Sequence, residues 1–316
     1  QQRHPQIASR RNGDFAITWE SGTDIYAELY DNMGNSIQSD FLVNQGTAGD
    51  QMYPDIAMEY DSRAFIIAWQ SIGTDGDAYG IFARRFDSLG IASSGDFAVN
   101  STTTNNQIEP SVATGSQQET VIAWSSFEQD GDNYGVYLQF YDATGTAMGG
   151  EIKVNDTTAS TQHHVDVTSL SDGFYLISWT SYDQDGDDGG VYTTVIDNTP
   201  AIVEQETQVH TQVIDQQQFS SVASNQSAPG KAVIVWQDGL HELPSTNEGQ
   251  AYGVYLQAFN SQFMAPVTSI DPDQTQASDF NWYMYPNPAQ DYTEIAFDGA
   301  ATELGLRGWI EEGKTI

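Results

Sequence analysis

The sequence predicts an all-β protein, a β-propeller of five blades with four antiparallel strands each. Five apolar segments end in tryptophan at intervals of 50 to 57 residues, and every interval is rich in β-branched and aromatic residues. Each interval also contains four short apolar segments in the same order. The tryptophans are Trp19, Trp69, Trp124, Trp179 and Trp236. Repetition at this interval is typical of repeated small sheets.

The four segments of a repeat each predict one strand. The first follows a glutamine and has the pattern Gln-x-x-x-x-[Val/Ile]-[Ala/Thr], and it recurs at residues 2–8, 51–57, 107–113, 162–168 and 217–223. The second runs into the tryptophan, which we expect to pack between blades rather than to face a ligand. The third begins at an aromatic residue and, in the first three repeats, ends in a turn of pattern Asp-x-x-Gly. The fourth is DFLVN, DFAVN, EIKVN, ETQVH or APVTS.

A four-stranded sheet of this size cannot bury both of its faces alone, so the repeats must stack on one another. Radial stacking gives a propeller. Two-sheet sandwiches need about 100 residues per domain, and solenoid coils are usually shorter than this repeat. We therefore expect one propeller over residues 1–275. Its repeats span residues 1–50, 51–106, 107–161, 162–216 and 217–275.

The composition excludes several partners. The formal net charge is −34, from 44 acidic and 10 basic residues. This charge repels nucleic acid and anionic membrane surfaces, and no apolar run is long enough to insert into a membrane. The chain contains no cysteine, so disulfides and thiolate metal sites are excluded as well.

Acidic loops between the second and third strands of three repeats suggest calcium sites. Carboxylates alternate around a central glycine at residues 74–77, 128–132 and 183–188. Such spacing lets oxygen ligands converge on a hard cation, because glycine allows the loop to curl. The alternative is that Asp-Gly makes a favourable hairpin turn and the other acids are solvated. The candidate ligands are Asp75, Asp77, Glu128, Asp130, Asp132, Asp183, Asp185 and Asp187.

The same loops suggest a ligand-binding face. In a four-stranded meander, the loops between second and third strands emerge beside the connections between repeats. This face gathers carboxylates, amides and aromatic rings, a combination that suits sugar hydroxyls. The candidate binding residues are Tyr79, Tyr134, Tyr252, Asn44, Asn100 and Asn155. The alternative is that these groups only keep the loop tips soluble.

The first strand of each repeat lies innermost in a propeller and offers a third kind of site. Asp55, Glu109 and Asp166 lie on these strands. Several glycoside hydrolase families use five-bladed propellers with carboxylates on the innermost strands, and two suitably separated acids perform acid and base catalysis. Each of the three can equally be a surface acid at a strand end. Among the five histidines, the pair His163 and His164 invites the idea of a metal site.

The repeats resemble those of large bacterial secreted and cell-surface propeller proteins. The resemblance rests on Trp-x-Ser-x-x-x-Asp-Gly-Asp-x-x-Gly-[Val/Ile]-[Tyr/Phe], as in residues 65–90 and 120–145. Near the end, Tyr285-Pro286-Asn287-Pro288-Ala289 is similar to the opening of the sorting domain of type IX secretion in Bacteroidetes-type bacteria. The resemblance implies a secreted or surface location and a contact with the secretion machinery. We expect a linker at 276–284 and a partial sorting domain or tail at 285–316.

Together these features favour a binding or adhesion protein over an enzyme. The expected partner is an extracellular glycan or another surface polymer, with calcium in the acidic loops. The first alternative is a polysaccharide-acting glycoside hydrolase, and the second is a structural spacer within a larger surface protein.

Overall fold

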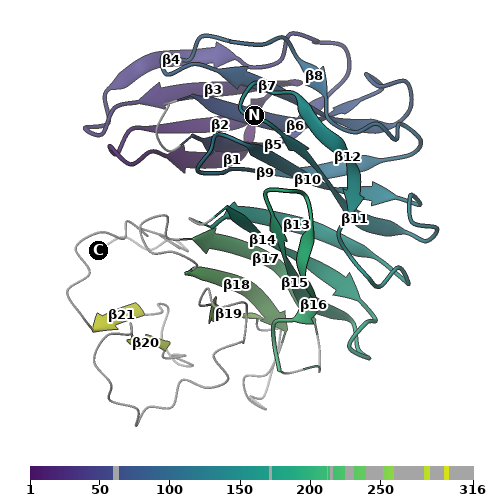
Figure 1. Ribbon diagram of the computed structural model, residues 1–316. Helices are drawn as coiled ribbons and strands as arrows, with labels where there is room; N and C mark the ends of the chain where they lie inside the picture. Colours follow the sequence, from purple (N-terminus) through teal and green to yellow (C-terminus); the bar gives the residue numbers. More distant parts are fainter. Residues whose placement is uncertain are drawn as a thin grey trace. The chain divides into compact units, whose positions relative to one another are not determined.

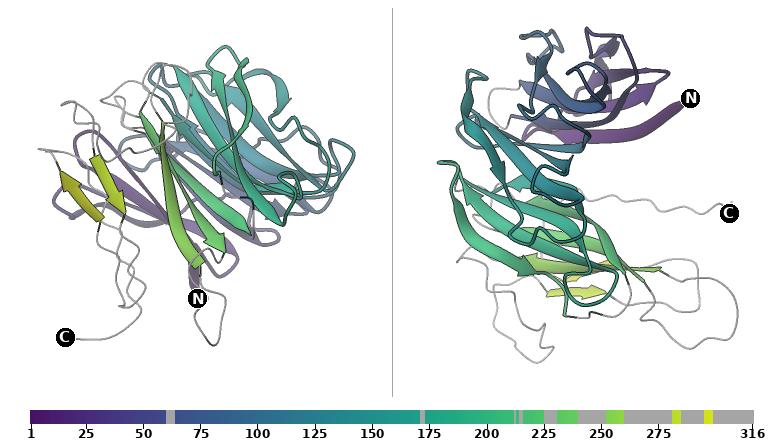
Figure 2. Two further views of the ribbon diagram at one scale, coloured as in Figure 1. Left: turned by 90° about the horizontal axis from the view of Figure 1, so that it is seen from below. Right: turned by 90° about the vertical axis from the view of Figure 1, so that its right-hand side faces the viewer.

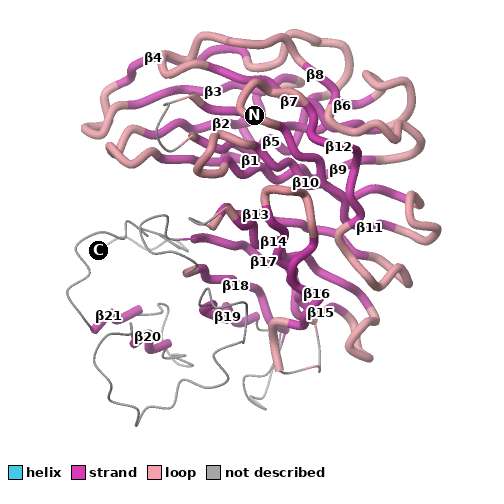
Figure 3. Tube along the Cα trace, viewed as in Figure 1, coloured by secondary structure: helices cyan, strands magenta, loops and turns pink. Residues whose placement is uncertain are grey.

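The computed structural model divides the chain into two units, Gln1–Val267 and Thr268–Ile316. It describes residues 1–59, 64–170, 173–211, 213, 216–224, 231–239, 252–259, 281–284 and 295–298. Over these residues the regular structure is β-strand throughout (Figure 3). No helix in this part of the chain has the length and apolar character needed to cross a membrane.

The first unit consists of five successive antiparallel sheets (Figures 1 and 2). The first four have four strands each, and three strands of the fifth are described. The strands of the first two blades are β1 (Gln2–Ser9), β2 (Phe15–Ser21), β3 (Asp24–Tyr30), β4 (Ser36–Leu42), β5 (Gln51–Met58), β6 (Phe65–Ile72), β7 (Tyr79–Phe86) and β8 (Phe97–Ala98). Those of the third and fourth are β9 (Gln107–Thr114), β10 (Thr120–Phe127), β11 (Tyr134–Tyr141), β12 (Ala147–Lys153), β13 (Gln162–Ser169), β14 (Phe174–Tyr182), β15 (Gly189–Asp197) and β16 (Ile202–Gln208). The fifth blade has β17 (Gln217–Ser224), β18 (Ala232–Gly239) and β19 (Tyr252–Phe259).

The predicted five-bladed propeller is confirmed. The first strands of neighbouring blades pack on one another in the order β1, β5, β9, β13 and β17. Residues 265–269, the expected fourth strand of the last blade, lie outside the described residues. In the second unit, β20 (Asn281–Met284) pairs with β21 (Ile295–Asp298). The strand β20 occupies the end of the expected linker, and the motif at 285–289 lies outside the described residues.

The core lies between blades, as stacking requires. Each tryptophan pairs across the sheet with the aromatic residue that begins the third-strand pattern, for example Trp124 with Tyr137 and Trp179 with Tyr192. The side chains of Trp69, Trp124 and Trp179 are at most 1% exposed. Apolar clusters join the first blade to the second, the second to the third, the third to the fourth and the fourth to the fifth. Trp69, Trp124, Trp179 and Trp236 are therefore core residues, as expected, whereas Trp19 is only partly buried.

Candidate functional site at the propeller axis

Every inner strand contains a β-bulge at the same place. The inner strand pairs with the second strand up to the residue after the glutamine, skips two residues opposite the tryptophan, and then resumes. Pro5, Pro54 and Pro110 occupy the second skipped position, where no strand partner needs the N–H that proline lacks. The first skipped residues, called the bulge residues below, are His4, Tyr53, Glu109, His164 and Phe219.

All five bulge residues adopt positive φ, between 47° and 55°. This conformation is uncommon for residues other than glycine, asparagine and aspartate, and it costs on the order of 1–3 kcal/mol where it is held. Bulges of this kind re-aim side chains and are over-represented next to active sites. Because this costly conformation repeats at five equivalent positions, the inner strands are the candidate location of a functional site.

The bulges surround a cavity of about 560 Å³, called the axial pocket, which receives residues from all five inner strands. All five bulge residues line it. A second set, called the ring residues, lies two positions further along each strand: Gln6, Asp55, Ser111, Asp166 and Ser221. The backbone repeats from blade to blade here, whereas the side chains differ. The axial pocket is therefore an asymmetric site on a nearly symmetric scaffold.

The ring residues Asp55 and Asp166 both line the pocket and join blades. Asp55 Oδ2 accepts a hydrogen bond from Val112 N of the next blade at 2.7 Å. Asp166 Oδ1 accepts from Ser111 Oγ at 2.9 Å, and its Oδ2 accepts from Ser221 Oγ and from the backbone of the fifth blade, both at 2.8 Å. Burial and the charge of Asp166 raise the pKa of Asp55 to about 7. Burial also raises the pKa of Asp166. Asp55 therefore holds its proton up to neutral pH.

Glu109 forms a cluster with the two adjacent histidines. Its Oε2 lies 3.0 Å from His164 Nδ1 and 3.9 Å from His163 Nδ1. Burial opposes ionisation of Glu109, but the hydrogen bond from His164 and the charges of both histidines outweigh it and lower its pKa. Burial and the neighbouring His164 lower the pKa of His163 to about 4, so its ring is neutral at pH 7.

Two exposed aromatic rings flank these polar groups. Tyr53 is 40% exposed and stacks on His4 with ring centroids 4.2 Å apart. Phe219 is 49% exposed and packs against His164 at 4.5 Å. Exposed aromatic faces beside fixed hydrogen-bond acceptors are features of ligand sites. Of the pocket residues, Asp55, Glu109 and Asp166 were predicted as candidates, and His164 was singled out with His163 as a candidate metal pair. The remaining bulge and ring residues were missed, although their positions two and four residues after each repeat glutamine could have revealed them.

The asparagines predicted to bind a ligand are buried in the fold. Asn44, Asn100 and Asn155 are 1%, 4% and 1% exposed. Each side-chain oxygen accepts a hydrogen bond from the backbone near the start of the third strand, and each amide nitrogen donates to an aspartate at or before that start. For Asn100 the donor is Ile81 N at 2.6 Å and the acceptor is Asp75 at 3.1 Å. These amides have a structural role, closing the fourth strand onto the third.

The acidic loops are also tied into the fold. Asp77 and Asp132 accept hydrogen bonds from backbone N–H groups of the following connectors, at 2.9 and 3.0 Å. Glu128 and Asp183 accept from side chains of the same connectors. Within the residues that the structure describes, the only three ligating side chains with ligand atoms within 4.8 Å of one another are Glu109, His163 and His164. Calcium binding at Asp75, Asp77, Glu128, Asp130, Asp132, Asp183, Asp185 and Asp187 stays a prediction.

The loop face carries two of the predicted tyrosines on described side chains. Tyr79 begins β7 and is partly buried, while Tyr134 begins β11 and makes an edge contact with Phe127 at 5.0 Å. Tyr252 begins β19, and its side chain is not among those that the structure describes. A cavity of about 310 Å³, lined by Trp69, Phe82 and Asp96 among others, opens between the first two blades. Neither Tyr79 nor Tyr134 lines this cavity or the axial pocket.

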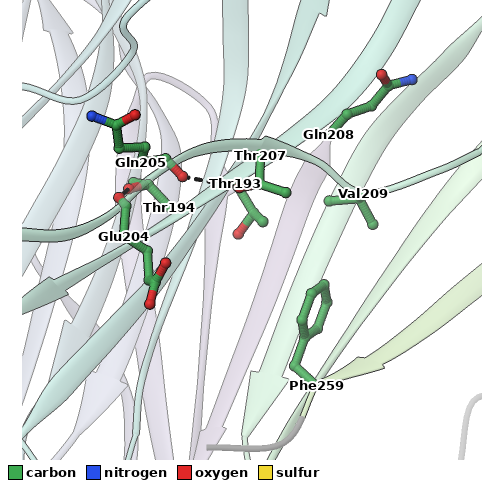
Figure 4. A pocket seen from close by; sticks show the side chains of 8 residues that line it. All are labelled: Thr193, Thr194, Glu204, Gln205, Thr207, Gln208, Val209 and Phe259. Carbon is green, nitrogen blue, oxygen red and sulfur yellow. Dashed lines mark hydrogen bonds between the residues drawn. The ribbon is translucent and has the colours of Figure 1, made fainter. Parts of the chain in front are cut away.

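One further cavity lies between the outer strands of the fourth blade and the fifth blade (Figure 4). Figure 4 shows Thr193, Thr207 and Phe259 among the side chains around it. Its volume is about 10 Å³, room for roughly one water molecule. It is too small for a sugar. Of the three cavities described, the axial pocket has the greatest volume and is lined by all five inner strands, so it is the candidate site.

No protein-family model and no curated protein sequence matches this chain. Among solved structures, the chain is similar to an endo-arabinase from Bacteroides thetaiotaomicron VPI-5482, with a TM-score of 0.49 and 13% identity over 80% of this chain and 92% of that chain. It is similar to an α-L-arabinanase from Cellvibrio cellulosa complexed with arabinohexaose, with a TM-score of 0.45 and 11% identity over 81% and 90% of the two chains. A protein of unknown function from Dyadobacter fermentans DSM 18053 has a TM-score of 0.40 and 10% identity, over 82% of this chain and 94% of that chain. Similarity at this level does not bear on activity.

Proposed function

We propose that this chain is a secreted or surface-attached propeller that binds an extracellular glycan in its axial pocket. The observation that carries the proposal is the asymmetry of the pocket. Five equivalent backbone positions present five different combinations of side chains, whereas the tryptophan repeats in all five blades and the buried asparagine in the first three. A purely structural spacer would not require different side chains at equivalent positions around the axis.

The chemistry of the pocket favours a sugar without negative charge. The exposed faces of Tyr53 and Phe219 suit the apolar face of a pyranose or furanose ring. Asp166 and Ser221, which are joined by a hydrogen bond, and the exposed Gln6 supply hydrogen-bonding groups for hydroxyls. The carboxylates of the pocket and the formal net charge of −34 disfavour sulfated or uronate-rich polymers. We therefore expect neutral or amino-substituted glycans as ligands.

The proposal is tested with a glycan array of neutral, amino-substituted and anionic polysaccharides, followed by calorimetric titration of the ligand that binds. Tyr53→Ala with Phe219→Ala should weaken binding by at least about tenfold, because stacking of a sugar on each exposed ring contributes on the order of 1 kcal/mol or more. Tyr134→Ala, on the loop face, is the matched control. If Tyr134→Ala abolishes binding and the axial variant retains it, the loop face and not the axis is the site.

Hydrolysis in the same pocket is the second candidate function. The observation that favours it is Asp55, a carboxylic acid that stays protonated to about pH 7 and can act as a general acid. A second carboxylate on another inner strand completes the pair that glycoside hydrolysis uses. Release of reducing sugar from a bound polysaccharide, lost in Asp55→Asn while binding persists, identifies an enzyme. A chain that neither binds nor cleaves any polymer supports the spacer.

Export is the remaining part of the proposal. We propose that residues 285–316 contact the type IX secretion machinery, on the strength of the motif at 285–289. Fusion of residues 276–316 to a reporter protein in a bacterium that has this system tests it. If the reporter stays inside the cell, the proposed contact with the secretion machinery is contradicted.

A further inference from the structure

Glu109 and His164 of the axial pocket converge with the neighbouring His163. The ligand atoms of Glu109, His163 and His164 lie within 4.8 Å of one another, and the side chains are 23%, 19% and 23% exposed. They are thus shielded but reachable from solvent. In the second blade, the inner strand carries Met52 and Tyr53 at the positions of the two histidines, and that blade forms the same bulge. The bulge does not depend on histidine.

Adjacent residues of a regular strand point to opposite faces of the sheet, so two neighbouring histidines cannot normally share a ligand. Here the bulge removes that restriction. His163 is the last paired residue before the skip, and His164 adopts a φ of 54°. The two rings consequently lie on the same side, with centroids 3.7 Å apart.

Neighbouring aromatic residues hold both rings in place. His163 stacks on Tyr182 at 5.3 Å, and the Tyr182 hydroxyl donates a hydrogen bond to Gln218. His164 packs against Phe219. Restrained rings lower the entropy that is lost when a ligand is bound, which is the usual role of the residues around a metal site.

The spacing of the three groups suits a small divalent ion. Ligand atoms on a tetrahedral zinc ion are roughly 3.3 Å apart, given zinc–ligand lengths of about 2.0–2.1 Å. The carboxylate oxygen lies 3.0 and 3.9 Å from the two Nδ1 atoms. All three ligand atoms lie within 4.8 Å of one another, so small side-chain rotations bring them toward the tetrahedral spacing.

We propose that Glu109, His163 and His164 bind a divalent transition-metal ion, with zinc as the best match to two imidazoles and one carboxylate. Three protein ligands leave a fourth position for water or for an oxygen of a bound molecule. This site differs from the calcium sites predicted in the acidic loops, since calcium prefers oxygen ligands alone. It stands whether or not the pocket binds a glycan.

The experiment uses the full chain, purified without a polyhistidine tag and stripped of metal with a chelator. Zinc is titrated by calorimetry, and bound metal is counted by elemental analysis after gel filtration. Cobalt is titrated in parallel, because four-coordinate cobalt gives intense visible absorption. The variants are His163→Ala, His164→Ala and Glu109→Gln. His4→Ala, which removes another histidine of the same pocket, is the matched control.

We expect one zinc ion per chain in the wild type and in His4→Ala, with affinity reduced at least about tenfold in each of the other variants. Calcium should not compete. Circular dichroism establishes whether each variant folds. If a histidine variant does not fold, the zinc affinity of Glu109→Gln, which keeps the side-chain size, tests the proposal. Zinc binding that is equal in wild type and Glu109→Gln, or that is lost as strongly in His4→Ala, overturns the proposal. So does a wild type that binds no zinc.

Discussion

Replacement of Asp55 by asparagine should remove a pH-dependent loss of stability that is built into the axial pocket. In the folded chain the pKa of Asp55 is about 7, against an ordinary value of 3.8. Between these pH values the folded state binds more protons than the unfolded state, so its stability falls as the pH rises. Asparagine has the shape of the protonated acid and can still accept the hydrogen bond from Val112 N, but it does not titrate.

The magnitude follows from the two pKa values. For a group with these values, raising the pH from 5 to 8 lowers the free energy of unfolding by about 2.6 kcal/mol. Asp55 borders an open pocket, and hydration there reduces the effect, so we expect about 1 to 2.6 kcal/mol. All other charges of the chain contribute to the pH dependence of both proteins alike, apart from Asp166, which is coupled to Asp55.

The assay is urea unfolding of the wild type and Asp55→Asn at pH 5 and pH 8, followed by tryptophan fluorescence. The quantity of interest is the difference between the two proteins at pH 8 minus the same difference at pH 5. Asp55→Asn should gain stability relative to the wild type as the pH rises. A double difference below about 0.5 kcal/mol, or one of the opposite sign, refutes the argument that burial keeps this acid protonated.

Three further outcomes follow from the fold and the loops. Asn100→Ala should lower the free energy of unfolding by about 1–3 kcal/mol, because it leaves buried backbone groups unpaired, whereas Asn133→Ala in an exposed loop should change it little; equal effects contradict the structural role of the asparagine. Trp124→Ala should cost about 3–5 kcal/mol through the cavity it creates, and urea unfolding that shows less than 1 kcal/mol contradicts the placement of the core. Calcium at millimolar concentration should raise the melting temperature by a few degrees, and Asp132→Ala with Asp187→Ala should abolish the rise. If the melting temperature is the same in chelator and in calcium, the prediction that these loops bind calcium is wrong.

The fold was predictable because its signals are local and repeated. A tryptophan at the end of each second strand, an aromatic residue opposite it and a glutamine before each first strand recur often enough to define the blade. The sheet pairing confirms the aromatic residue opposite each tryptophan. Each second strand continues two or three residues past its tryptophan, and each glutamine is the first residue of its inner strand. The bulge was not predicted, even though three prolines mark it, since proline in a strand equally fits an edge position.

The site was predictable only in part. Asp55, Glu109 and Asp166 were identified because several glycoside hydrolase families carry carboxylates on the innermost strands of a propeller, and the three do line one pocket. The roles of Asn44, Asn100 and Asn155 were not evident, because the sequence does not reveal which backbone groups an amide will face. His163 and His164 stood out only as a pair. That both rings reach Glu109 depends on a backbone conformation that strand periodicity does not suggest.

The bulge has a consequence for how such a protein can change. A bulge residue pairs with no residue of the second strand, so its replacement leaves the ladder of that blade untouched. Chemistry at the axis and the stability of the blades are thereby set by different positions. Recognition could then diverge between related chains through a handful of exchanges at the centre, while the repeats themselves stay almost uniform. Grafting the bulge and ring side chains of one such propeller onto another should transfer its ligand preference.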